Sequence, residues 1–158
     1  MSDNIAIFAA GCFWGVENNF MDLEGVIGTS VGYIGSNFKD PTYFDVCTGA
    51  TGHAEAVRVQ FDDSIINFEE LCNFFFKIHD PTTLNRQGPD SGSQYRSAIF
   101  CLSAEQKEIA TGVVKKLEQE KIFPSIIVTE ICDASQYYLA EDYHQKYIKK
   151  NNLQSCGG

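Results

Sequence analysis

Three side chains in this sequence have the types and settings that thiol and acid chemistry require. Cys12 follows Gly11 at the expected first turn of a helix, where unpaired N–H groups and the helix dipole favour a thiolate. Glu55 lies on the apolar face of a predicted strand, where an ionised carboxylate is costly, so we expect a raised pKa suited to a general acid. Cys156 lies in a polar, glycine-rich tail that can carry a second thiol to Cys12. These residues point to redox chemistry at a cysteine.

Each of the three residues also has a purely structural interpretation. Cys12 can be a buried thiol at an apolar junction between a strand and a helix. Glu55 can be solvated at the mouth of its strand, or paired with Arg58 or Arg96. Cys156 can be an incidental tail residue. Residue type and position alone leave both interpretations open.

Further polar side chains lie in expected loops. Tyr43 follows Pro41-Thr42, and the long polar loop after residue 79 contains Asp90 and leads to Tyr95 at the start of a strand. A loop tyrosine can direct its hydroxyl at a substrate, although more often it covers the edge of a core. The three histidines, which are His53, His79 and His144, are each expected to be structural.

The elements that must position these residues follow from hydrophobic periodicity. Apolar spacing predicts helices at 12–23, 67–78 and 103–117 and a mostly helical segment at 138–150. Gly11, the Asn67/Glu70 pair and Ser103 are the expected N-terminal caps. Apolar and alternating runs predict strands at 4–10, 26–34, 54–61, 95–102 and 126–132. This mixed order favours an α+β fold in which helices cover one sheet in a two-layer sandwich.

Composition limits the class of protein. The chain has 158 residues, 44% of them hydrophobic, and a formal net charge of −9 with only 12 Lys and Arg, so we expect one globular unit that binds neither nucleic acid nor anionic membranes. No apolar run approaches the roughly 20 residues that cross a bilayer, and no secretory segment is evident, so we expect a cytoplasmic protein. None of the 6 cysteines forms a C-x-x-C pair, and no glycine-rich phosphate loop appears. We therefore expect no metal and no cofactor.

The sequence resembles a known family along nearly its whole length. The resemblance begins with the run G-C-F-W-G-V-E at 11–17 and V-G-Y at 31–33. It continues with P-T-Y at 41–43, T-G-H-A-E-A-V at 51–57, Q-G at 87–88 and Q-Y-R-S-A-I at 94–99. It ends with A-E-D-Y-H-Q at 140–145. These motifs, in this order, are similar to those of class A peptide methionine sulfoxide reductases.

The resemblance implies a fold and a set of roles. It implies a ferredoxin-like α+β sandwich that reduces the S epimer of methionine sulfoxide. Cys12 is then the nucleophile, and Phe13 and Trp14 form an apolar cage for the methyl group on the sulfoxide sulfur. Glu55 is the acid that protonates the sulfoxide oxygen. The residues expected to assist it are Tyr43 and Tyr95, which hydrogen-bond that oxygen, and Asp90, which supports them.

The resemblance also implies how the enzyme is regenerated. Cys12 would become a sulfenic acid, Cys156 would condense with it to a disulfide, and thioredoxin would reduce that disulfide. The aromatic residue that is common before this cysteine in the family is absent here. Whether Cys47 or another thiol could replace Cys156 stays open, and we expect Cys47 to be structural. We expect a monomer with a catalytic domain at 1–150 and a flexible tail at 151–158.

Three other functions fit parts of the pattern. A thiol peroxidase also uses an activated cysteine and a resolving thiol, but the aromatic pair after Cys12 suits a methyl-bearing substrate better. A module that only recognises oxidised methionine would not need both Cys12 and Glu55. A Cys–His hydrolase would need an oxyanion-hole motif, and none is evident.

Overall fold

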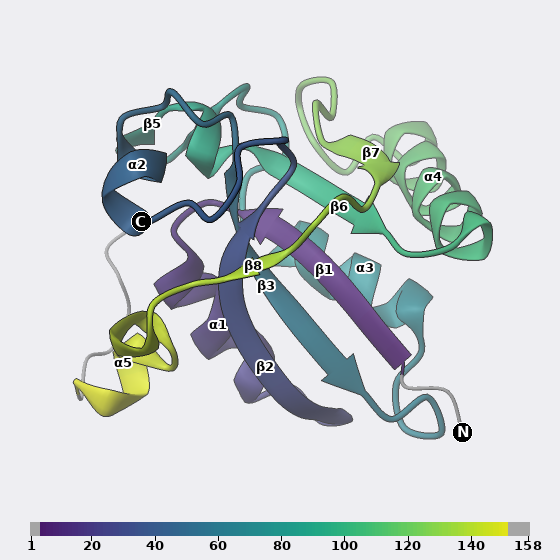
Figure 1. Cartoon of the computed structure of the whole chain (residues 1–158). Helices are drawn as coiled ribbons and strands as arrows, with labels where there is room; N and C mark the ends of the chain where they lie inside the picture. Colours follow the sequence, from purple (N-terminus) through teal and green to yellow (C-terminus); the bar gives the residue numbers. More distant parts are fainter. Residues whose placement is uncertain (1–3, 152–158) are drawn as a thin grey trace.

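The computed structural model describes residues 4–151, and Figure 1 shows one sheet with helices packed against it. The helices are α1 (Phe13–Met21), α2 (Tyr43–Cys47), α3 (Phe68–Lys77), α4 (Ala104–Gln119) and α5 (Tyr147–Lys150), with 3-10 turns η1 (Ser93–Tyr95) and η2 (Asp142–His144). The strands are β1 (Asn4–Ala10), β2 (Val26–Ile34), β3 (Ala54–Phe61), β4 (Arg86–Gln87), β5 (Asp90–Ser91), β6 (Ser97–Cys101), β7 (Glu130–Asp133) and β8 (Tyr138–Leu139).

The main sheet has the strand order β7-β6-β1-β3-β2-β8, and β4 pairs with β5 separately. Only β6 and β7 run parallel; the other neighbours in the main sheet are antiparallel, so the sheet is mixed. The central strands β1 and β3 are buried along most of their length, because both faces of the sheet are covered where they lie. Glu55 is the carboxylate within this buried stretch of β3.

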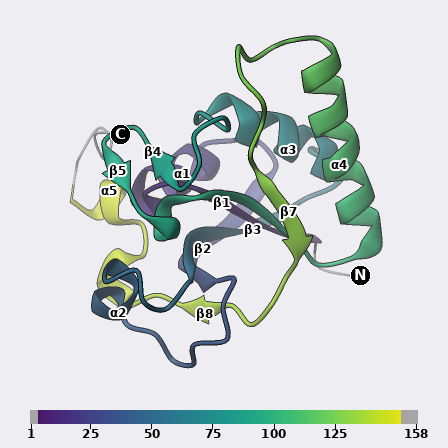
Figure 2. The same cartoon turned by 90° about the horizontal axis from the view of Figure 1, so that it is seen from above.

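The main core lies between the sheet and helices α1, α3 and α4, which Figure 2 shows on one face. Its centre is an aromatic stack in which the Phe8 ring lies 5.2 Å from both Phe20 of α1 and Phe75 of α3. Such stacking adds to the free energy of apolar burial and fixes the helices on the sheet. The start of α1, which carries the cysteine motif, is thereby held by the core.

The opposite face of the sheet is covered by the chain that leads from β7 to β8. A smaller core of Ile7, Ile34 and Phe100 packs there against Tyr137. Gly32 makes the crossing possible, since a Cβ at this position would lie 2.5 Å from a ring atom of Tyr137. Figure 1 shows this segment running across the sheet towards η2 and α5. The crossing brings η2 and α5, the last elements of the described residues, beside α1.

The structure confirms the expected α+β sandwich and corrects four local predictions. The segment 138–150 is not mostly helical: it forms β8, η2 and the short α5, because it follows β2 as an edge rather than packing a helical face. Cys12, not Gly11, is the N-cap of α1. Tyr43 starts a helix rather than lying in a loop, because Thr42 and Asp45 form a capping box. The strands expected at 95–102 and 126–132 are shorter, as β6 and β7.

Two further predictions concern membrane-spanning helices and the C-terminal tail. Within residues 4–151, no helix is long and apolar enough to span a membrane. Cys156 lies outside the described residues, as does nearly all of the expected tail. The division into a catalytic domain at 1–150 and a tail at 151–158 therefore stays a prediction.

Candidate active site

Cys12 lies at the junction of the central strand β1 and helix α1. It caps the helix, and its carbonyl accepts the first helical hydrogen bond from the Val16 N–H at 3.3 Å. Gly11 takes a φ of +103°, and a Cβ there would lie within 2.9 Å of the Gln87 side chain. Only glycine satisfies both conditions, so the sharp turn that presents Cys12 depends on Gly11. The thiol is half-buried at the N-terminal end of α1, where the helix dipole favours negative charge.

Glu55 is brought to the same helix terminus from the neighbouring strand β3. Its side chain is buried, with 1% exposure, and Oε1 accepts a hydrogen bond of 3.2 Å from the Phe13 backbone N–H. This burial excludes the alternative that Glu55 is solvated at the mouth of its strand. Of the two arginines considered as partners, Arg58 is exposed and Arg96 pairs with Glu130 at 3.3 Å. The buried acid therefore lies beside the residue that follows Cys12, as a proton donor to the reaction would require.

Aromatic rings gather around the start of α1. The Tyr43 ring lies 6.4 Å from Phe13 and 6.3 Å from Trp14, measured between centroids. Tyr43 also lies 4.3 Å from the ring of His144. These rings come from α1, α2 and η2, and α5 packs beside α1 (Figure 1). The expected cage residues Phe13 and Trp14 are thus in ring contact with one of the expected hydrogen-bonding tyrosines.

The two tyrosines remain protonated over the whole neutral range. Burial, a hydrogen bond to the Cys47 thiol and the nearby charge of Glu55 raise the pKa of Tyr43 far above its usual value. Burial also raises the pKa of Tyr95 to about 12. Nearby acidic groups raise this pKa further, and these are Glu55, Cys47, Asp90 and Cys12. Tyr95 therefore lies within electrostatic reach of three of the expected catalytic groups.

The loop that carries Asp90 and Tyr95 is fixed by its own side chains. The Gln87 amide binds both backbone groups of Asp80: it accepts from the N–H at 2.7 Å and donates to the carbonyl at 2.8 Å. Gln87 then pairs with Asp90 across the β4–β5 ladder. Because Gln87 also packs on Gly11, this one side chain joins the loop to the cysteine turn.

Sequence reasoning missed two residues that build the site. Glu141 accepts hydrogen bonds of 2.8 Å from the Tyr33 hydroxyl and from the Tyr43 backbone N–H. Burial opposes ionisation of Glu141, but these hydrogen bonds outweigh it and lower its pKa. His144, which we expected to be merely structural in a helix, accepts a 2.9 Å hydrogen bond from the Trp14 indole N–H. Both lie in the A-E-D-Y-H-Q motif, and that motif was the available signal.

The site offers thiol and acid groups rather than a metal centre. Among residues 4–151, no group of three or more His, Cys, Asp or Glu side chains is placed to hold a metal ion. A cysteine at a helix N-terminus, a buried carboxylate and two protonated tyrosines lie near the aromatic rings of Phe13 and Trp14. This combination defines the class of thiol-dependent oxidoreductases in which an acid assists attack by a cysteine.

Comparison with known proteins identifies the family. The family model described as "Peptide methionine sulfoxide reductase" matches residues 4–157. "Peptide methionine sulfoxide reductase MsrA" of Methanosarcina acetivorans is 55% identical over 148 residues, which are 94% of this chain and 79% of the relative. The chain belongs to the peptide methionine sulfoxide reductase family, as its motifs indicated. It is an oxidoreductase that reduces methionine sulfoxide with thiols.

Solved structures agree with this assignment. Mxr1 from Saccharomyces cerevisiae in reduced form superposes with a TM-score of 0.90 at 34% identity, covering 98% of this chain and 88% of that chain. Mxr1 in complex with Trx2 superposes with a TM-score of 0.65 at 24% identity, covering 92% of this chain and 84% of that chain. The first likeness confirms the expected fold of the sandwich, and the second shows the fold alone.

Proposed function

We propose that this chain reduces the S epimer of methionine sulfoxide, free and within proteins, through Cys12. The observation that carries the proposal is the hydrogen bond from the Phe13 N–H to the buried Glu55 carboxyl, which holds an acid at the helix turn where Cys12 lies. Phe13 and Trp14 would bind the methyl group, and the ring contacts with Tyr43 place a phenol next to them. The sulfur of methionine sulfoxide carries a methyl group and an oxygen. The apolar rings of Phe13 and Trp14 suit the methyl group, and the Tyr43 hydroxyl suits the oxygen.

The proposed reaction has two stages, and in the first the substrate is reduced and Cys12 is oxidised. The Cys12 thiolate attacks the sulfoxide, the S–O bond of the substrate breaks, and the oxygen is transferred to sulfur of Cys12 with a proton from Glu55. Methionine is released, reduced by two electrons, and Cys12 is left as a sulfenic acid. The Tyr43 and Tyr95 hydroxyls, which stay protonated because their pKa values are raised, would donate hydrogen bonds to the oxygen as charge develops on it. Asp90 would support Tyr95, whose pKa responds to the Asp90 charge.

The oxidised cysteine must then be restored. The Cys156 thiol would condense with the Cys12 sulfenic acid, which forms a disulfide and releases water. Exchange with an external dithiol would return both thiols, and the dithiol would leave as its own disulfide. Thioredoxin is the proposed dithiol. A solved complex of Mxr1, which has the same fold, with Trx2 supports this choice.

Two further properties belong to the proposal. The other four cysteines that the structure describes, Cys47, Cys72, Cys101 and Cys132, are thiols, which suits a reducing compartment such as the cytoplasm. We also propose that a monomer is the working unit.

The experiment compares the two sulfoxide epimers. Wild type and Cys156→Ser are assayed on peptide-linked S- and R-methionine sulfoxide, each with dithiothreitol and with thioredoxin. We expect turnover of the S epimer only, and Cys156→Ser should lose the thioredoxin-supported rate while keeping the dithiothreitol-supported rate. Turnover of neither epimer by the reduced wild type would overturn the proposal, and peroxide consumption in its place would favour a thiol peroxidase.

A further inference from the structure

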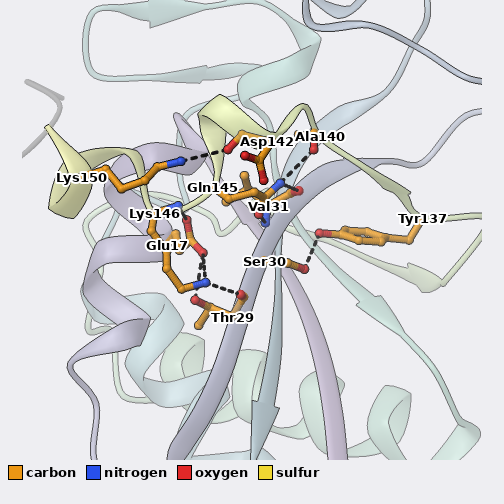
Figure 3. Close-up of polar contacts among 10 residues, drawn as sticks. All are labelled: Glu17, Thr29, Ser30, Val31, Tyr137, Ala140, Asp142, Gln145, Lys146 and Lys150. Carbon is orange, nitrogen blue, oxygen red and sulfur yellow. Dashed lines mark hydrogen bonds and ion pairs between the residues drawn. The ribbon is translucent and has the colours of Figure 1, made fainter.

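A fully buried carboxylate on α1 holds the last part of the described chain. Glu17 has 0% exposure, and its Oε1 accepts a hydrogen bond of 2.6 Å from the Lys146 backbone N–H. Its Oε2 accepts a 2.8 Å hydrogen bond from the Thr29 hydroxyl, and the Lys146 ammonium lies 3.9 Å away (Figure 3). Hydrogen bonds to an ionised, buried acceptor are stronger than neutral ones. Glu17 therefore fixes the backbone of Lys146 directly.

The neighbouring residue fixes the same segment to the sheet. The Gln145 side-chain amide accepts from the Val31 N–H at 2.9 Å and donates to the Val31 carbonyl at 3.0 Å. It also donates to the Ala140 carbonyl at 2.9 Å, as Figure 3 shows. The amide thus satisfies the edge of β2 as a neighbouring strand would. Lys146 takes a left-handed φ of 55° between η2 and α5, so the backbone at this point is strained and needs such contacts.

The residues on either side of this anchored point both contact Trp14. His144 accepts the 2.9 Å hydrogen bond from the indole N–H. Tyr147 stacks on the indole with centroids 3.9 Å apart and an interplanar angle of 11°. Trp14 and Glu17 lie one turn apart on α1, so the helix contacts the same segment through an indole and through a carboxylate. A shift of Lys146 would displace both partners of the indole.

We propose that Glu17 is a positioning residue for the substrate cage: by anchoring Lys146 it sets the orientation of His144 and Tyr147, and through them that of Trp14. The inference rests on the proposed function, in which Trp14 binds the substrate methyl group. Glu17 itself does not touch substrate. Loss of its charge weakens substrate binding and leaves the chemical groups at Cys12 and Glu55 in place.

The sequence supplies a direct reporter, because Trp14 is its only tryptophan. The emission maximum and acrylamide quenching of Trp14 are measured for the wild type, Glu17→Gln and Gln145→Ala, together with KM and kcat for the S-sulfoxide with dithiothreitol. Val113→Ala, in the core on α4, is the control for a general loss of stability. Gln145→Ala tests the same segment through the second anchor, should Glu17→Gln fold poorly.

In both segment variants we expect a red shift, about twofold faster quenching and a KM raised by about tenfold, the size that follows from losing one charge-assisted hydrogen bond at Glu17 or several neutral ones at Gln145. The kcat should stay within about twofold, because the interaction contributes equally to ground and transition states. Val113→Ala should change neither the Trp14 emission nor KM. Folded variants with the wild-type emission and KM would overturn the inference. Should the wild type lack turnover, the proposed function fails, while the fluorescence still decides whether the anchor orients Trp14.

Discussion

The two sides of the candidate site are built in different ways. Cys12, Phe13 and Glu55 lie on the start of α1 and on β3, which the aromatic core and the central ladder hold in place. Tyr43 and Tyr95 lie on a five-residue helix and a 3-10 turn, and single side chains hold these elements. We call Cys12, Phe13 and Glu55 with their elements the framework side, and Tyr43 and Tyr95 with theirs the loop side. The framework side carries the proposed redox and proton-transfer steps. The loop side carries hydrogen-bond donors, whose contributions can be shared.

The attachments of the loop side are few. Glu141 ties the backbone of Tyr43 to Tyr33 in β2, and the Gln87 amide closes the loop on Asp80. The Arg96 guanidinium donates to the Ser93 carbonyl at 2.8 Å and thereby closes the turn that ends at Tyr95. The comparison predicts that substitutions on the framework side change rate most and that substitutions on the loop side have graded effects.

The largest effect is expected at Cys12. Cys12→Ser should lower the dithiothreitol-supported rate by at least roughly a thousandfold, because a hydroxyl can be neither the thiolate nucleophile nor the oxygen acceptor. The rate is measured on S-methionine sulfoxide, and Cys132→Ala serves as the matched cysteine control with a near wild-type rate. A Cys12→Ser variant with a tenth of wild-type activity would place the nucleophile elsewhere.

Glu55 should rank next. Glu55→Gln keeps the shape but removes the proton, so we expect kcat to fall by roughly a hundredfold to a thousandfold. The kcat values are measured on S-methionine sulfoxide with dithiothreitol. Glu55→Asp keeps an acid at this position and is the control, with a smaller loss. A Glu55→Gln variant with a near wild-type kcat would remove Glu55 from the proton-transfer step.

The tyrosines should show graded effects. Tyr43→Phe and Tyr95→Phe each remove one donor, and we expect about a tenfold loss of kcat for each, since the remaining donors still stabilise the oxygen. The double variant should lose about a hundredfold or more. Rates of the two single variants and the double variant form the cycle that measures this. A single tyrosine variant as impaired as Glu55→Gln would contradict the proposed division between the two sides.

The smallest effect is expected on the pH dependence of stability, through His79 at the start of the loop that carries Asp90. The His79 ring contacts the Phe75 carbonyl and the Ser97 hydroxyl, each at 2.7 Å, and burial lowers the pKa of His79 to about 4. The unfolded chain therefore binds a proton that the folded chain does not, and stability should fall as pH decreases from about 6.5 towards 4, by at most about 1.4 kcal/mol per pH unit.

Urea unfolding of wild type and His79→Gln over this pH range measures the slope. The variant should be less stable at neutral pH and should have a shallower slope, because it lacks the titrating ring. His144, whose pKa burial also lowers, contributes a slope that both proteins share. Identical slopes in the two proteins would show that the loop is not tied to the fold through a neutral His79.

The framework side could be predicted from local sequence, and the loop side could not. The Asn67/Glu70 capping box and the alternation around Glu55 are local signals, and both held. Helix α2 was missed because its five residues give no periodicity. The segment after Tyr138 was mistaken for a helix because its structure comes from contacts over a hundred residues away in sequence, such as Gln145 with Val31 at a separation of 114.

The nature of the site followed from motif resemblance more than from physics. Cys12 and Glu55 were candidates on physical grounds, and the fold brings them to one helix terminus. The supporting contacts of Glu141 and His144 depend on tertiary packing that no pattern of residue types contains. Periodicity reports which face of an element is buried, but it does not report which distant side chain meets it.

The central claim is that Cys12 takes the oxygen from the sulfoxide, and a reaction without reductant tests it most directly. Cys156→Ser is mixed with excess S-methionine sulfoxide, methionine is quantified, and Cys12 is examined by mass spectrometry after dimedone trapping. The account predicts one methionine per chain and a dimedone adduct at Cys12, whereas wild type should form a Cys12–Cys156 disulfide with the same yield. Methionine formed while Cys12 stays reduced, or oxidation at another cysteine instead, would contradict it.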